Sequence, residues 1–175
     1  MIYELSDYKN DMHEADEIYL RVIRGALICP NTGDIIKLSP YELDALKKYA
    51  LAIKAQYIGA AGKRLRQAVA VDLLEKLKSA GWDITPAVAV AVAKMLLGRG
   101  VNRKMLLDMY ATPGRTAAEK ADFTCLAELP KNPLFISALD KLNMLLAEAI
   151  RIRKHIFKDY EKSEAYKLLS IAAGG

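Results

Sequence analysis

The chain has 175 residues, of which 53% are hydrophobic and 27% are charged, and its formal net charge is +5 at pH 7. This length and composition predict a single helical domain over 1–175, and the lack of any run of about 18 uncharged apolar residues argues against a membrane span or a membrane partner. Glu4 and Asp7 stand where a signal peptide would be basic and then apolar, so we expect a cytoplasmic protein.

The first predicted element is an acidic, amphipathic helix over 7–24. Ser6 is a suitable cap, apolar residues recur at three- and four-residue spacing from Tyr8 to Val22, and Gly25 follows as a stop. Two β-prone runs come next, on either side of the turn-forming segment 30–33. They predict a small β-hairpin over 26–38.

A helical body is predicted over 40–129. Its first start signal is a capping box. The Ser39 hydroxyl can accept a hydrogen bond from a free backbone amide of the first turn, and the Glu42 carboxylate can accept one from the Ser39 amide. The proline at position 40 suits the first helical position, where no amide donor is needed. Segment 87–93 alternates Ala and Val, which is the period of a strand. Because both residue types are apolar and a Thr-Pro pair precedes them at 85–86, we favour a helix there, with a strand as the alternative.

The longest predicted helix covers 133–160 and follows Asn132, which can cap it. Its apolar residues from Phe135 to Ile156 alternate three- and four-residue spacings, as in a heptad pattern, and a short helix follows Ser163. The predicted fold class is therefore mainly α, a helical bundle of about six or seven helices with a small β-hairpin near the N-terminus and a long C-terminal helix.

The sequence contains two His and two Cys residues, and no two of these four lie close together. Segment 59–64 fails as a phosphate-binding loop because Arg64 stands where Ser or Thr would hold magnesium. The acidic face around His13 could ligate a metal, but a solvated helix face is the preferred interpretation. We therefore predict a protein that is not an enzyme, without catalytic residues, metal or cofactor.

The charge is distributed unevenly along the chain. Residues 1–20 carry six acidic side chains against one lysine, a formal charge of −5, so the remainder carries +10. The basic clusters could bind phosphates if they share one face, and segment 93–110 loosely resembles a helix-turn-helix. The candidate nucleic-acid contacts are Lys63, Arg64, Arg66, Arg99, Asn102, Arg103, Lys104, Arg151, Arg153 and Lys154. Alternatively, these cations keep a helical protein soluble and favour helix C-termini.

Apolar residues in the C-terminal part outnumber what one exposed helix should carry, which predicts a docking surface. The candidate protein-interface residues are Phe135, Leu142, Leu145, Ile152, Ile156, Leu168, Leu169 and Ile171. The favoured function is a non-enzymatic helical assembly or adaptor subunit that acts through protein–protein contacts, as a homo-oligomer or within a larger complex. DNA binding is the alternative.

Overall fold

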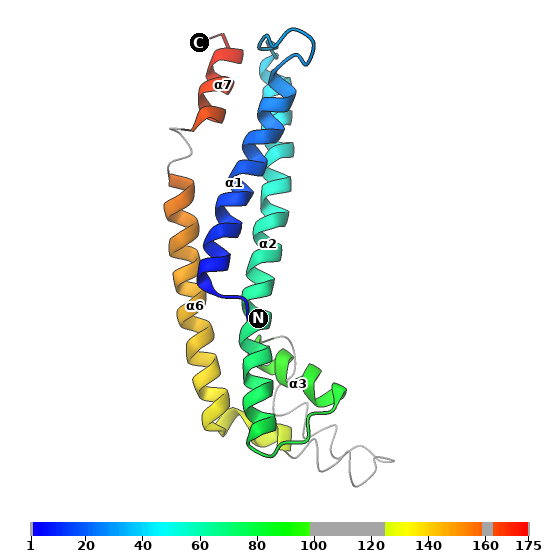
Figure 1. Ribbon diagram of the computed structural model, residues 1–175, viewed down its shortest axis with the longest axis vertical. Helices are drawn as coiled ribbons and strands as arrows, with labels where there is room; N and C mark the ends of the chain where they lie inside the picture. The colour runs from blue at the N-terminus through cyan, green and yellow to red at the C-terminus, as the bar shows by residue number, and fades with distance from the viewer. Residues whose placement is uncertain (1, 99–124, 159–162, 175) are drawn as a thin grey trace. The chain divides into compact units, whose positions relative to one another are not determined.

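The structure is a computed structural model that describes residues 2–98, 125–158 and 163–174 (Figure 1). Within these ranges the elements are α1 (Leu5–Leu27), α2 (Pro40–Ser79), α3 (Pro86–Leu96), the 3-10 helix η1 (Leu129–Lys131), α6 (Pro133–Lys158) and α7 (Glu164–Ala172). The mainly α fold class is confirmed. Among these described helices, none combines the length and apolar character that a membrane crossing requires.

The predicted β-hairpin over 26–38 is wrong. The described residues form no strand there, and the two runs meet only at one isolated antiparallel bridge, between Ile28 and Ile35. The cause is that α1 continues past Gly25 to bury Leu27 completely, which takes the start of the first run into the helix. The second run is exposed except for its last residue, Leu38, which packs against the core of unit 2, so this run offers too little buried apolar surface to stabilise a two-stranded ladder.

The tight turn was predicted in the right place. The Cys29 amide donates to the Asp34 carbonyl at 2.8 Å, and the Gly33 amide donates to the Cys29 carbonyl at 2.8 Å. Gly33 has a φ of +73°, a left-handed conformation that glycine adopts without strain. The segment is therefore a closed turn between two helices.

Local capping chemistry explains where the helices begin. At α2, the Glu42 amide donates to the Ser39 hydroxyl and the Ser39 amide donates to the Glu42 carboxylate, both at 3.2 Å. Ser163 likewise caps α7. The cap of α1 differs from prediction: Glu4 and Asp7 form a reciprocal capping box, so the helix begins before the expected Ser6 cap and residue 7.

Segment 87–93 is helical, which confirms the favoured alternative. Thr85 caps α3 by accepting from the Val88 amide at 3.3 Å. Val88, Val92 and Leu96 are buried at a spacing of four residues. The alternation of Ala and Val therefore reflects composition, while the helical period decides which side chains are buried.

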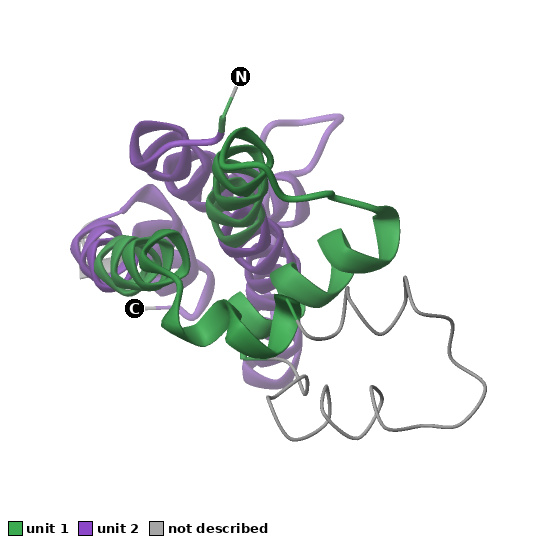
Figure 2. Cartoon of the chain, turned by 90° about the horizontal axis from the view of Figure 1, so that it is seen from below, with its two compact units in different colours: residues 1–2, 65–146 green, residues 3–64, 147–175 purple. Residues whose placement is uncertain are grey.

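The chain forms two compact units, coloured separately in Figure 2. Unit 1 comprises residues 1–2 and 65–146, and unit 2 comprises residues 3–64 and 147–175. Both α2 and α6 contribute residues to each unit. Whether the chain behaves as one folding domain stays a prediction.

Unit 1 has its own hydrophobic core. It joins Leu73 and Leu77 of α2 to Val92 of α3, and Leu129 and Phe135 pack into the same cluster. The first four of these side chains are fully buried. Residues 99–124 of the predicted helical body over 40–129, and with them most of the helix-turn-helix-like segment 93–110, lie outside the described residues.

Unit 2 has a second core, in which α7 packs against α1. Tyr19 and Ile23 of α1 are fully buried together with Ala50 of α2. Ala165 and Ala172 of α7 complete the cluster, since their small side chains allow the two helices to approach closely. The C-terminal helix is thus part of the core of this unit.

Candidate functional site

A row of polar contacts joins α1 to α2 within unit 2, and Lys54 lies at one end of it. The Lys54 ammonium lies 2.8 Å from an Asp16 carboxylate oxygen and 5.1 Å from the centre of the Tyr19 ring. The two charged side chains are 7% and 23% exposed, so this ion pair is largely shielded from water. A buried lysine needs such a partner because an unpaired ammonium loses its hydration without compensation.

The same row continues toward the start of α1. The Arg64 guanidinium lies 3.0 Å from the Asp11 carboxylate, which also accepts a hydrogen bond from the Tyr3 hydroxyl. Burial, and next the hydrogen bond to Asp11, raise the pKa of Tyr3 above its ordinary value. A hydrogen bond to Glu14 raises the pKa of Tyr57 in the same way.

The acidic face of α1 is therefore not simply solvated, as the preferred interpretation of the sequence had it. Asp11, Glu14 and Asp16 contact side chains of α2, and Glu17 pairs with Arg21 on α1 itself. Within the described part of the chain, no three His, Cys, Asp or Glu residues gather as a metal site would need. The contacts on α1 hold two helices together.

The predicted nucleic-acid contacts fall into different settings. Arg64 is bound to Asp11, and Arg151 contacts Glu148 through two hydrogen bonds of 2.8 and 3.1 Å, which raise its pKa. Lys63 and Lys154 are exposed, while Arg66 and Arg153 are half-buried. Arg99, Asn102, Arg103 and Lys104 lie outside the described residues. Two of the six described cations are therefore already neutralised by a carboxylate of their own chain.

One basic hollow does form in unit 2, with a volume of about 320 Å³. Lys9 of α1 lines it together with Arg151 and His155 of α6, and Ile152 and Ile156 supply its apolar surface. The cationic lining suits an anionic group, although Glu148 competes for Arg151.

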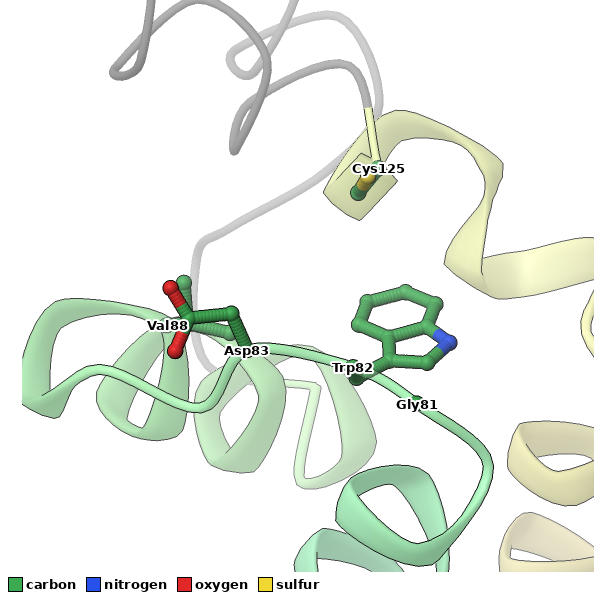
Figure 3. A pocket seen from close by; sticks show the side chains of 5 residues that line it. All are labelled: Gly81, Trp82, Asp83, Val88 and Cys125. Atoms are coloured by element: carbon green, nitrogen blue, oxygen red, sulfur yellow. The ribbon is translucent and has the colours of Figure 1, made fainter.

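A second hollow, of about 190 Å³, lies in unit 1 (Figure 3). It is lined by Gly81, Trp82, Asp83, Val88 and Cys125. Figure 3 shows the Asp83 side chain pointing away from the indole ring of Trp82. Its described lining residues supply one carboxylate and one thiol, and they include no histidine or lysine that could activate the thiol as a nucleophile.

The predicted protein-interface residues are mostly covered by their own chain. Phe135, Leu142 and Ile156 are buried, and the half-buried members are Leu145, Ile152, Leu168 and Leu169. Leu168 and Leu169 pack against the core of unit 2, and Leu145 packs against that of unit 1. Only Ile171 of this set is exposed. The apolar stripe seen in the sequence mainly supplies core contacts.

The apolar residues that do remain exposed include two tyrosines that the sequence analysis did not select. Tyr41 is 83% exposed and Tyr49 is 62% exposed, both on the first half of α2. The signal was present in the sequence, because uncharged residues recur on one side of this helix from 41 to 59. It was missed because the other residues on that side are small or polar rather than strongly apolar.

Comparison with known proteins adds no relative. No protein-family model, curated protein or solved structure matches this chain.

Proposed function

We propose that this chain is a non-enzymatic helical assembly or adaptor subunit that acts through protein–protein contacts. The observation that supports it is the exposure of Tyr41 and Tyr49 on a helix whose other face is packed in unit 2. Tyrosine is enriched at protein interfaces, where its ring buries a large area and its hydroxyl tolerates water. The proposal thus places the contact on α2, in addition to the exposed Ile171 of α7.

Size-exclusion chromatography with light scattering tests this role on the full chain. We expect a mass above that of the monomer, rising with concentration over the micromolar range. A dissociation constant of about 1 μM corresponds to a binding free energy of about −8 kcal/mol, which a modest helix–helix contact can supply. A monomer throughout this range argues against self-assembly.

DNA binding is the second candidate, and the basic hollow formed by Lys9, Arg151 and His155 favours it. Titration with duplex DNA at low and at moderate salt tests this function. Because binding to phosphates releases counterions, affinity should fall steeply as salt rises, and Arg153→Ala with Lys154→Ala should flatten that dependence. The absence of binding at low salt removes this candidate.

A further inference from the structure

We propose that one face of α2 is a self-association surface, onto which α2 of a second copy of this chain packs in the antiparallel direction. This inference rests on the proposed function and names its partner. The face, called here the α2 dimer face, consists of Tyr41, Ala45, Tyr49, Ala52, Gln56 and Gly59. These residues recur every three or four positions, so they share one side of a helix with about 3.6 residues per turn.

The α2 dimer face is unusual for a helix surface in contact with water. All six of its residues are exposed, and none is charged, in a chain with 27% charged residues. Solvated helix faces normally carry charges, whereas interface cores lack them and are rich in tyrosine. At about 1.5 Å per residue, the uncharged face is about 28 Å long.

The described residues of unit 2 leave this face exposed. The buried residues of α2 between positions 41 and 61 are Ala50, Lys54 and Ala61, which lie on the opposite side of the helix. The α1 contacts of Lys54 confirm that this opposite side faces the neighbouring helix. A change on the α2 dimer face should therefore affect association without removing a core contact.

The distribution of large and small residues selects an antiparallel second copy. Both tyrosines lie in the first half of the face, and its far end is Gly59, where a Cβ atom would meet nothing within 4 Å. Parallel copies would place large residues against large and small against small. Antiparallel copies place the half of the face that holds both tyrosines against the second half of the facing helix, where this face has no large apolar side chain, so that side chains fill the spaces of the facing helix.

Charges at the two ends favour the same arrangement. Glu42 lies beside the start of the face, and the exposed Lys63 lies one turn beyond its end. A register that brings Glu42 of each copy to Lys63 of the other is centred between residues 52 and 53, so Ala52 sits at the two-fold axis. Symmetry forms both ion pairs at once, and such pairs at a rim set orientation more than affinity.

The first test is Ala52→Arg in the full chain, measured by sedimentation velocity against concentration. The wild type should form a dimer, and the variant should dissociate at least tenfold more readily because two arginines would meet at the axis. Ala147→Arg, also on an exposed helical position, is the matched control and should remain as dimeric as the wild type. Circular dichroism of each variant checks that helix content is unchanged.

The outcomes of this test distinguish a failure of the α2 dimer face from a failure of the proposed assembly role. A wild-type dimer that Ala52→Arg leaves intact overturns the α2 dimer face while the assembly role stands. A wild type that stays monomeric at every concentration overturns both.

Cysteine cross-linking tests the direction independently, in a background where Cys29 and Cys125 are changed to Ser. Ala52→Cys should form a disulfide-linked dimer on mild oxidation, because the two copies of residue 52 face each other. Ala45→Cys should not, since its two copies are about 22 Å apart at 1.5 Å per residue, but it should cross-link when mixed with Ala60→Cys. Efficient cross-linking of Ala45→Cys with itself overturns the antiparallel arrangement.

Discussion

Replacing Asp16 by Ala should destabilise unit 2 far more than its position on a helix surface suggests. The change leaves the Lys54 ammonium, now 2.8 Å from the Asp16 carboxylate, in a setting where its side chain is only 7% exposed. Removing one partner of a buried ion pair costs about 3–5 kcal/mol. Because Asp16 is 23% exposed and the Tyr19 ring still attracts the cation, the lower end, about 3 kcal/mol, is expected.

The assay is urea denaturation followed by circular dichroism at 222 nm. Alanine is the best helix former, so a weakened helix propensity does not explain a loss of stability. A loss of about 3 kcal/mol is a large share of the 5–15 kcal/mol typical of a domain. Fluorescence of Trp82, the one tryptophan of the chain, provides a probe located in unit 1.

The matched control is the double variant Asp16→Ala with Lys54→Met, which removes both charges and keeps most of the buried volume. It should recover to within about 1 kcal/mol of the wild type, because buried ion pairs are often no more stabilising than apolar residues of similar size. The reasoning is refuted if Asp16→Ala costs less than about 1 kcal/mol or if the double variant is less stable than the single one.

Three further predictions test other local contacts. Hydrogen bonds lower the pKa of Glu42 below its ordinary value. Its contribution to stability is therefore fully present when the pH is above the pKa of the unfolded chain, and it is lost as the pH falls through the lower pKa of the folded state. The urea midpoint of Glu42→Gln should lack this pH dependence. Hydrogen bonds led by that from Thr32 lower the pKa of Cys29, so Thr32→Val should slow alkylation of this thiol about two- to tenfold at pH 7, as measured by mass spectrometry. Leu73→Ala should cost about 2–5 kcal/mol in a urea titration, whereas Leu51→Ala, at an exposed position, should cost under about 1 kcal/mol.

Helix starts were the part of the fold most readily predicted from the sequence, because a cap depends on residues within one turn. The hydroxyls of Ser39, Thr85 and Ser163 each accept a hydrogen bond from the backbone amide three residues further on, as expected of helix caps. Helix ends were predicted less well, since they depend on distant contacts. Gly25 did not end α1, because burying Leu27 in unit 2 outweighs the roughly 1 kcal/mol that glycine costs within a helix.

The partners of the charged residues could not be predicted, because pairing across helices depends on how the helices face each other. The formal charge of −5 in residues 1–20 was visible, but not that Asp11 and Asp16 would contact Arg64 and Lys54. The exposed side of α2 was more accessible to prediction. Its uncharged residues follow the helical period in the sequence, but the sequence alone does not show which side of the helix the core leaves exposed.

These pairings change what the basic character of the chain can do. A cation that already pairs with a carboxylate must exchange that partner before it can bind a phosphate, which lowers its contribution to association by the value of a surface ion pair, up to about 1 kcal/mol. Arg64 and Arg151 are both in this state. Meanwhile the α2 dimer face carries no charge that would need to be desolvated. The electrostatic cost of forming a contact is therefore lower on α2 than at the basic clusters, which is the physical reason for placing protein association ahead of DNA binding.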